Sequence, residues 1–295
     1  MKDSSIIQAI GNTPLIKLYS VTKDLPKKVE IYAKAELLNP GGSVKDRPAL
    51  RMIQEGIRTG ELSPGKIIMD PTSGNTGVAY AMIGSALGYR VELVVPENVS
   101  RARKEIAKSY GAKLTFSSAM EGSDGAIRLS QKLKAENPDK YFMPNQYNNH
   151  LNPQAHYEST GIEIYEQTAG RITHFITGIG TSGTVMGVGR RLKEYSSDIK
   201  VYAAEPAEAL HGLEGLKHME SSIVPGIYDP SQLDGVRPIA TEVGYEMTER
   251  LALEEGLFVG YSSGANVAAA LELAKDLKEG VVVTILCDSG TRYLC

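Results

Sequence analysis

The sequence predicts an α/β protein with two domains, each built on a mostly parallel, twisted sheet that carries helices on both faces. Its 295 residues are enough for two mid-sized domains with hydrophobic cores of their own. Short apolar segments alternate with longer amphipathic ones, which is the pattern of repeated strand–helix units. Most of the short segments are apolar on both faces, as is typical of parallel strands covered by helices on both sides.

Seven short apolar segments are the predicted strands. They span residues 30–36, 66–70, 90–96, 113–116, 173–177, 199–205 and 281–287. Helical patterns lie between several of them, at residues 75–88, 100–111, 184–195 and about 264–277. Ser100 and Gly111 are a typical capping residue and a typical stop for the second of these helices. The polar, turn-rich stretch 145–153 is the predicted crossing between the two domains.

The composition favours an ordinary enzyme and argues against nucleic-acid and membrane partners. The chain is 42% hydrophobic and 23% charged, and its net charge of −3 provides no basic field for nucleic acid or an anionic membrane. It contains no apolar run long enough to span a membrane and no signal-peptide core near its start, so we expect a cytoplasmic protein. Two cysteines, and five histidines without ligand spacing, predict no metal site.

The stretch GIGTSG, from Gly178 to Gly183, contains the glycine pattern of dinucleotide-binding turns. It lies between a predicted strand and a predicted helix, and Glu205 ends the next strand, where a ribose-binding acid is expected. The same backbone could instead hold a single phosphate, because glycines let N–H groups approach the ligand and a helix N-terminus favours its charge. A tight turn without a ligand is the third interpretation. The loop alone leaves all three open.

Lys45 lies in NPGGSVKDR, directly after a glycine–serine turn and near the start of a predicted helix. An ordinary lysine at this position would be solvated and paired with Asp46. A lysine held beside a turn with an apolar neighbour, here Val44, can instead form a Schiff base with an aldehyde.

The stretch PTSGNTG, residues 71–77, follows another predicted strand and opens a helix. Its small hydroxyl and amide side chains surround backbone N–H groups, which makes it suitable for binding a carboxylate. Simple N-capping by Ser73 or Asn75 is the alternative, and both can hold at once. The stretch GYSSGAN, residues 260–266, is a further turn before a helix, where capping by one of its serines is the simplest interpretation.

Taken together, these motifs resemble those of the cysteine synthase and cystathionine β-synthase family of pyridoxal-phosphate enzymes, which have fold type II, the tryptophan-synthase-β-like fold. NPGGSVKDR, PTSGNTG, GIGTSGT and GYSSGAN occur in the family's order, and GNTPL at 11–15 and DSGTRYL at 288–294 match as well. The resemblance spans nearly the whole chain. It implies pyridoxal 5′-phosphate as the cofactor, so that the glycine loop binds one phosphate monoester and not a dinucleotide.

The resemblance implies a role for each motif. Lys45 would be the Schiff-base lysine and the catalytic base. Asn75 would hydrogen-bond the cofactor's ring hydroxyl oxygen, and Ser262, in preference to Ser263, the pyridine nitrogen. The residues implied to bind the cofactor around its phosphate are Gly178, Gly180, Thr181, Ser182, Gly183 and Thr184. Those implied to hold the substrate carboxylate are Thr72, Ser73, Thr76 and Gln146.

The implied reaction is β-replacement, in which an activated serine exchanges its β-substituent for a sulfur nucleophile. We therefore expect a cysteine synthase that makes L-cysteine from sulfide and O-acetyl-L-serine or O-phospho-L-serine. Its partners would be these small molecules and, in a homodimer, a second copy of the chain. The predicted smaller domain is 39–147, mobile and carrying the carboxylate loop; the larger is 1–38 plus 148–295, carrying the phosphate and ring-nitrogen sites.

The sequence leaves several alternatives open. Lys217 or His218, in the loop before VPG, is a tentative contact for the donor's β-substituent, and solvent-exposed charge is the other interpretation. The sulfur acceptor could be sulfide, thiosulfate or a carrier thiocarboxylate. A compact bacterial cystathionine β-synthase, which joins serine and homocysteine, shares the same motifs. An NAD(P)-dependent dehydrogenase is a distant alternative that would have no use for Lys45 together with the Asn75 loop.

Overall fold

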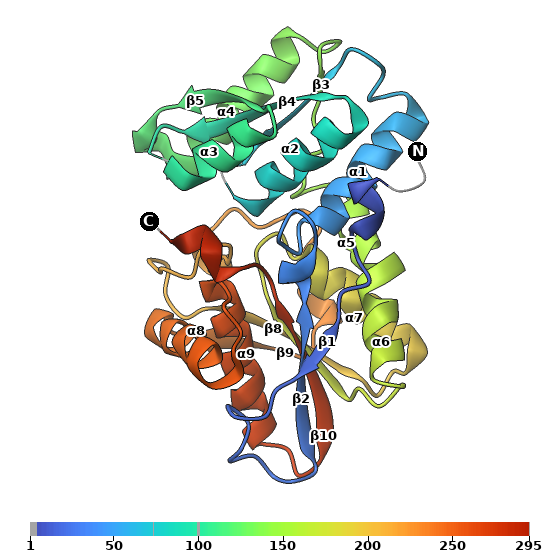
Figure 1. Ribbon diagram of the computed structural model, residues 1–295, viewed down its shortest axis with the longest axis vertical. Helices are drawn as coiled ribbons and strands as arrows, with labels where there is room; N and C mark the ends of the chain where they lie inside the picture. The colour runs from blue at the N-terminus through green and yellow to red at the C-terminus, as the bar shows by residue number, and fades with distance from the viewer. Residues whose placement is uncertain (1–4, 73, 99–100, 295) are drawn as a thin grey trace. The chain divides into compact units, whose positions relative to one another are not determined.

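The computed structural model describes residues 5–72, 74–98 and 101–294, and these form two compact α/β units (Figure 1). The described part of the smaller unit is 5–10, 40–72, 74–98 and 101–149, and that of the larger unit is 11–39 and 150–294. Residues 5–10, which the sequence predicts in the larger domain, join the smaller unit because the short 3₁₀ helix η1 (Ile6–Ala9) packs against α2 (Asn75–Leu87).

The smaller unit contains a four-stranded sheet in the order β5-β4-β3-β6, with every pair parallel. Its strands are β3 (Ile67–Pro71), β4 (Arg90–Pro96), β5 (Lys113–Ser117) and β6 (Tyr141–Phe142). Its helices are α1 (Asp46–Thr59), α2, α3 (Arg101–Ser109) and α4 (Gly122–Glu136), with the short 3₁₀ helix η3 (Ala119–Glu121) before α4.

Helices cover both faces of this sheet. Met69 and Val94 face α4, and together with residues of that helix they form a buried apolar cluster. Successive side chains of a strand point to opposite faces, so Ile68 and Asp70 face the other way, towards α2. A Cβ at Gly84 of α2 would lie 2.4 Å from the Val91 side chain, so glycine is what allows α2 to approach the sheet this closely.

The larger unit contains a six-stranded sheet in the order β1-β2-β10-β7-β8-β9, in which only the β1–β2 pair is antiparallel. Its strands are β1 (Leu15–Lys17), β2 (Val29–Ala35), β7 (His174–Gly178), β8 (Lys200–Pro206), β9 (Gly235–Ile239) and β10 (Gly280–Leu286). Its α-helices are α5 (Leu151–Ala155), α6 (Gly161–Gln167), α7 (Gly183–Tyr195), α8 (Thr241–Glu255) and α9 (Tyr261–Lys275). Its other helical segments are η2 (Glu36–Leu38), η4 (His156–Thr160), η5 (Met219–Ser221), η6 (Pro230–Gln232) and η7 (Gly290–Tyr293).

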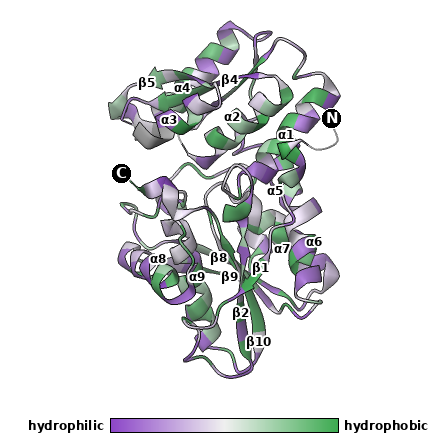
Figure 2. Ribbon diagram, in the orientation of Figure 1, coloured by the Kyte–Doolittle hydropathy of each residue, from purple (hydrophilic) through white to green (hydrophobic). Residues whose placement is uncertain are grey.

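Two helical layers enclose the larger sheet. Helices α8 and α9 lie on one side of it and α5, α6 and α7 on the other (Figure 1). Hydrophobic residues concentrate in the strands and in the helix faces that meet them (Figure 2). Helix α9 is buried along most of its length, because its alanines and Val267 let it sit directly on the sheet.

The predicted α/β class and the fold of parallel sheets with helices on both faces are confirmed. All the predicted strands are present, each within one residue of its predicted bounds. The predicted helix at 264–277 is wrong at its start, because α9 begins at Tyr261 with Gly260 as its extended N-cap. Both serines of GYSSGAN therefore lie inside the first turn of the helix and do not precede it. The capping residue predicted at Ser100 lies outside the described residues.

Candidate active site

Lys45 stands at the N-cap of α1 and is partly buried. The turn before it is closed by Asp46, whose fully buried carboxylate accepts a hydrogen bond of 2.5 Å from the Gly41 N–H. The Ser43 hydroxyl accepts the Lys45 N–H at 3.3 Å. The acid at the start of α1 also matches the positive end of the helix dipole. Asp46 thus closes the turn that holds the backbone of Lys45, a structural role that the sequence does not predict.

The predicted carboxylate residues of the smaller unit lie at the carboxyl ends of its strands. Thr72 follows β3 directly, and Asn75 and Thr76 are the first two residues of α2. Gln146 comes from the segment after β6, and its side-chain oxygen accepts a hydrogen bond of 2.8 Å from the buried Thr76 hydroxyl. The structure therefore brings the predicted carboxylate residues Thr72, Thr76 and Gln146 to the same end of the sheet as Asn75, which is predicted to contact the cofactor ring. Ser73 lies outside the described residues.

The first turn of α2 retains its capacity to bind an anion. Its N-cap is Gly74, which has no side chain of its own to cap the helix. The alternative of N-capping by Asn75 does not hold, because Asn75 is already the first helical residue. N–H groups at a helix N-terminus attract carboxylate and phosphate, so this end of α2 suits the carboxylate of an amino acid.

The glycine loop of the larger unit connects β7 to α7 and forms a closely packed cup. A Cβ at Gly180 would lie 2.3 Å from the Gly215 carbonyl oxygen, and one at Gly183 would lie 2.0 Å from the Asn152 side-chain oxygen. Asn152 in turn donates a hydrogen bond of 3.0 Å to the Thr181 hydroxyl. Both glycines are thus required by close approach of neighbouring groups, and the loop is not an incidental tight turn.

Ser182 is the residue of this cup whose buried hydroxyl lacks a hydrogen-bond partner among the described residues. It is the N-cap of α7, has a φ of 70°, and is only 2% exposed. Among the described residues, no group hydrogen-bonds its hydroxyl oxygen, although the atom is buried. Buried polar atoms without a partner are rare in native proteins and call for an explanation. A phosphate at the N-terminus of α7 would satisfy the hydroxyl and the helix N–H groups together.

Thr184 is the second residue of α7, and its hydroxyl is 3.3 Å from Nε2 of His156. The other ring nitrogen of His156 is 2.9 Å from the Thr160 hydroxyl. His156 therefore orients Thr184 from the η4 segment. The chain's residues fit a phosphate monoester, because hydroxyls, backbone N–H groups and close-packed glycines meet at one helix end.

The two serines at the start of α9 are distinguished by their hydrogen bonds. Both are buried, and the Ser263 hydroxyl accepts the Cys287 N–H at 2.8 Å. Ser263 therefore fixes the segment after β10, which leaves Ser262 as the better candidate to meet a pyridine nitrogen. The positive end of the α9 dipole disfavours a protonated, cationic nitrogen at this position.

Asn266 is a buried residue of this site that sequence reasoning missed. Its side-chain oxygen accepts the Gly178 N–H at 2.6 Å, and its amide donates to the Ile285 carbonyl at 2.8 Å. It is fully buried, so each of these bonds is made away from water. One turn after Ser262 on α9, Asn266 thereby joins the end of β7, where the glycine loop starts, to the end of β10. Its position in GYSSGAN was the only signal available.

Lys217 lies beside the glycine loop. Its backbone N–H donates a hydrogen bond of 2.8 Å to the Ile179 carbonyl, and the side chain is partly exposed. His218 contacts the Ser221 hydroxyl at 2.8 Å within its own loop. Lys217 is therefore the better placed of the two tentative donor contacts.

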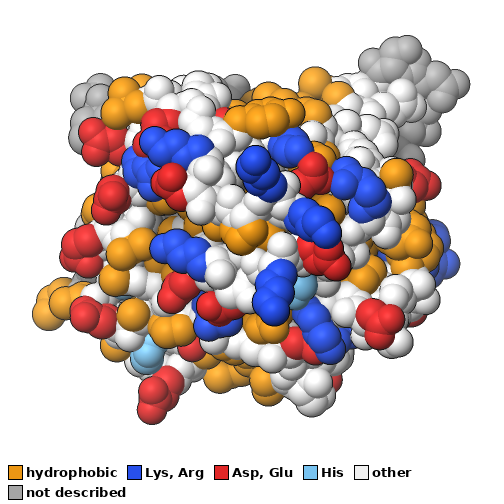
Figure 3. Space-filling model, turned by 90° about the horizontal axis from the view of Figure 1, so that it is seen from below, with side chains coloured by type: hydrophobic (Ala, Val, Ile, Leu, Met, Phe, Trp, Pro, Cys, Tyr) orange, Lys and Arg blue, Asp and Glu red, His pale blue; other side chains and the backbone are white. Residues whose placement is uncertain are grey.

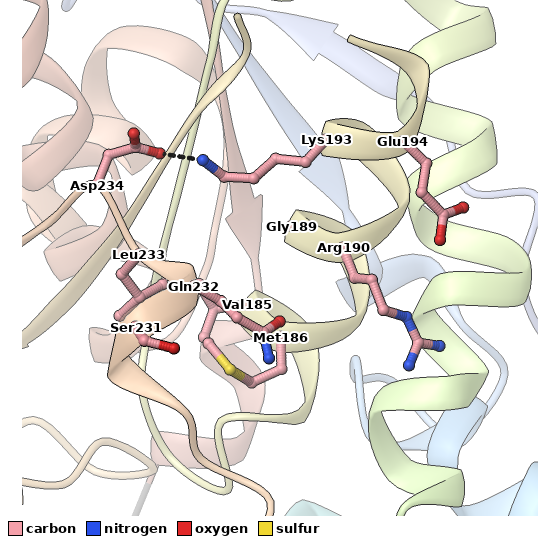
Figure 4. Close-up of a pocket in the computed structure, with 10 residues that line it drawn as sticks. All are labelled: Val185, Met186, Gly189, Arg190, Lys193, Glu194, Ser231, Gln232, Leu233 and Asp234. Carbon is pink, nitrogen blue, oxygen red and sulfur yellow. Dashed lines mark hydrogen bonds and ion pairs between the residues drawn. The ribbon is translucent and has the colours of Figure 1, made fainter. Parts of the chain in front are cut away.

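A cavity of about 400 Å³ opens elsewhere on the larger unit, between one side of α7 and the segment 231–234 (Figure 4). Val185 and Met186 are among its lining residues, and Lys193 reaches across to Asp234, with which it forms a hydrogen bond of 2.6 Å. None of the predicted site residues lines it. The cavity is therefore separate from the chemistry assigned to the motifs.

On the face shown in Figure 3, lysine and arginine side chains are interspersed with aspartate and glutamate. This face therefore carries no large patch of one charge. Among the described residues, no helix is both long and apolar enough to cross a membrane.

Comparison with known proteins identifies the family. The profile of a family described as pyridoxal-phosphate dependent enzyme matches residues 6–288 of this chain. The chain belongs to this family of pyridoxal-phosphate-dependent enzymes. It is 50% identical over 295 residues to a protein named cysteine synthase from Aquifex aeolicus (strain VF5), covering 98% of this chain and 90% of that protein.

Solved structures agree with this assignment. A cysteine synthase from Entamoeba histolytica superimposes with a TM-score of 0.94 at 36% identity, covering 99% of this chain and 89% of that one. An O-acetylserine dependent cystathionine β-synthase from Helicobacter pylori superimposes with a TM-score of 0.92 at 37% identity, covering 100% and 98%. This pyridoxal-phosphate enzyme has fold type II, as predicted.

Family membership also decides between the interpretations of the glycine loop. The cofactor of this enzyme is pyridoxal phosphate, as predicted, and the NAD(P)-dependent dehydrogenase is excluded. Glu205, the proposed ribose-binding acid, has a structural use instead: its carboxylate accepts the Met219 N–H at 3.2 Å and so fixes the loop that carries Lys217.

Replacing Ser182 by alanine should lower the affinity for the cofactor without destabilising the cofactor-free protein. The variant loses a phosphate donor, but it also loses a buried hydroxyl whose lack of a partner costs about 1–3 kcal/mol. Cofactor titration by absorbance and thermal unfolding of the cofactor-free protein measure the two effects separately. Ser130→Ala is the matched control, because its buried hydroxyl is satisfied by the Ile127 carbonyl at 2.8 Å and its loss should only destabilise. Unchanged cofactor affinity in Ser182→Ala would contradict the assignment of the Ser182 hydroxyl to the cofactor phosphate.

Proposed function

We propose that this enzyme is a cysteine synthase, which replaces the β-substituent of O-acetyl-L-serine or O-phospho-L-serine with sulfide. The observation that carries the proposal is the 50% identity to a cysteine synthase over nearly the whole chain. It is supported by the residues present, since Lys45, the PTSGNTG loop, the glycine loop and Ser262 supply groups suited to this chemistry. Pyridoxal phosphate supplies an electron sink for the charge released when bonds at the substrate's α-carbon break.

Lys45 is assigned two tasks. Its Nζ atom would hold the resting cofactor covalently. It would then take the α-proton of the bound amino acid as a general base and return a proton to the α-carbon of the product. Its place at the start of α1, in a turn closed by Asp46, supports this assignment because the backbone of Lys45 is held while its long side chain can move between these positions.

The larger unit would hold the cofactor in place. The N–H groups and hydroxyls of the glycine loop, with the orphaned Ser182 hydroxyl among them, would bind the phosphate. The Ser262 hydroxyl would donate a hydrogen bond to the ring nitrogen without transferring a full proton. A serine at this position would thus supply less positive charge to the ring than an aspartate-paired proton, which would disfavour racemisation and transamination and favour loss of the β-substituent.

The smaller unit would bind the amino-acid substrate. The N–H groups at the start of α2, with the side chains of Thr72 and Thr76, would hold its carboxylate, and Gln146 would orient the Thr76 hydroxyl. Asn75 would donate to the cofactor's ring hydroxyl oxygen. These groups fix the α-carbon of the substrate, which is what a proton transfer to and from Lys45 requires.

Lys217 is proposed to contact the donor's β-substituent. If it does, Lys217→Ala should raise KM for O-phosphoserine by up to about fivefold, because ion pairs of partly exposed lysines contribute about 0.2–1 kcal/mol. KM for O-acetylserine should change less, since that group carries no charge. Lys28→Ala, which removes an exposed lysine, is the control. Unchanged kinetics of Lys217→Ala with both donors would refute this role.

A cystathionine β-synthase is the second candidate, because the Helicobacter pylori protein described as O-acetylserine dependent shares the fold along the whole chain. Assays of each serine donor with sulfide and with homocysteine separate the two. We expect the higher kcat/KM with sulfide. A preference for homocysteine would overturn the proposed reaction while leaving the cofactor assignment intact.

The family resemblance also supports a homodimer in the cytoplasm. Sedimentation of the purified enzyme at several concentrations measures the assembly.

A further inference from the structure

Asp70 is a buried acid at the end of β3 to which the reaction assigns no task. It faces α2, on the side of the sheet opposite Met69, and its side chain is 1% exposed. It immediately precedes the segment 71–77, which is proposed to bind the substrate carboxylate. A buried carboxyl group without a full set of partners strongly favours its neutral form.

The surroundings of Asp70 are apolar or weakly polar. Among the described residues, neither carboxyl oxygen has a partner at hydrogen-bonding distance, and the same is true of the fully buried Tyr80 hydroxyl. The Asn145 N–H and the Tyr80 hydroxyl face the carboxyl group and favour its ionisation, but burial outweighs them and raises the pKa of Asp70 to about 7. Burial and the nearby Asp70 likewise raise the pKa of Tyr147.

No compensating cation faces Asp70 from the described elements packed around it. Tyr80 from α2 and Tyr147 from the segment after β6 are the titratable groups that interact with it. The neighbouring acid of the sheet, Glu92, is different: it points to the α4 face and is paired with Lys113 at 2.9 Å. If Asp70 were ionised, its negative charge would therefore have no cation beside it among the described residues, unlike that of Glu92.

Asp70 also connects the two segments proposed to bind the carboxylate. Thr72 is two residues along the chain, at most about 7 Å away in backbone length. Asn145, whose N–H faces Asp70, has a φ of 53° and directly precedes Gln146. Gln146 bonds Thr76, and Tyr80 lies one turn after Thr76 on the same side of α2. A charge on Asp70 would thus act on every part of the proposed carboxylate site.

We propose that Asp70 is a positioning residue that must be protonated for this site to bind a substrate carboxylate, so that carboxylate binding is coupled to a proton on Asp70. This inference rests on the proposed function of the 72–76 loop. An ionised Asp70 would place a second negative charge close to the bound carboxylate, and because Asp70 is only 1% exposed, water would screen that charge poorly. Like charges in such surroundings repel strongly. Binding therefore draws a proton onto Asp70, and rising pH opposes it.

The test uses the holoenzyme and propionate, a carboxylate without an amino group that cannot displace the cofactor from Lys45. Dissociation constants are measured by calorimetry between pH 6.5 and 8.5, in two buffers whose ionisation heats differ, which also counts the protons taken up. For wild type, Kd should rise about tenfold or more across this range, with proton uptake on binding. In Asp70→Asn, Kd should change less than about twofold, without uptake.

Two further variants keep the test decisive. Glu92→Gln removes the other buried acid of the sheet and should retain the wild-type pH profile. Tyr80→Phe removes a group that favours ionised Asp70, so the pH dependence of the propionate Kd should move to higher pH. This variant still tests the coupling to Asp70 if Asp70→Asn fails to fold. Propionate binding without proton uptake, or an unchanged profile in both Asp70→Asn and Tyr80→Phe, overturns this proposal alone. No propionate binding to any variant overturns the carboxylate assignment as well.

Discussion

Lys45→Ala is expected to reduce kcat by at least about 10²–10⁴-fold, the range over which a positioned proton-transfer group accelerates a reaction. The loss should be larger still if the same amine also holds the cofactor. Steady-state production of cysteine from O-acetylserine and sulfide measures the effect. Because Lys45 lies at the N-cap of α1 and the turn before it is closed by Asp46, the fold should survive the change.

Two controls separate chemistry from folding in this variant. Lys28→Ala removes a lysine that is 78% exposed and should leave the rate unchanged. Circular dichroism should show the same helix content in both variants. If Lys45→Ala retained more than about a tenth of the wild-type kcat, the lysine would not be the catalytic base.

Gly180→Ala should destabilise the protein by about 1–3 kcal/mol and abolish tight cofactor binding, as expected when a group is forced into a packed site. The added Cβ would lie 2.3 Å from the Gly215 carbonyl oxygen. That obstacle is backbone, so it can be relieved only by displacing the glycine loop or the loop that carries Lys217. Urea unfolding and cofactor titration measure the two consequences.

Gly183→Ala provides the matched comparison. Its Cβ would lie 2.0 Å from a side-chain oxygen, that of Asn152, so the second substitution Asn152→Ala should restore part of the lost stability. No single side-chain truncation should do so for Gly180→Ala. Normal stability and cofactor affinity in Gly180→Ala would show that the glycine loop is more open than described.

The fold was predictable where hydrophobic pattern and length agree. The strands buried on both faces gave continuous apolar runs, and these were located within one residue. The strands that were missed lack such a run. β1 (Leu15–Lys17) has only three residues and β6 (Tyr141–Phe142) only two. β9 (Gly235–Ile239) is an edge strand that contains a proline and is half exposed along its length. Helix α8 carries charged residues throughout and packs mainly on α9, so its pattern was weak.

The site was predictable from motifs only for residues that contact a ligand by themselves. Asn266 and Asp70 escaped notice because their importance comes from partners distant in sequence. Asn266 bonds Gly178 and Ile285, and Asp70 faces the N–H of Asn145. The choice between Ser262 and Ser263 likewise depended on a bond from Cys287, which no local pattern reveals.

Reduction of the purified enzyme with borohydride, followed by peptide mass mapping, shows which side chain holds the cofactor. The Nζ atom of Lys45 should be bonded to the aldehyde carbon of pyridoxal phosphate in the resting enzyme. We expect the peptide containing Lys45 to carry the mass of the reduced cofactor. An unmodified Lys45, with the cofactor attached to another lysine or to none, would contradict the account.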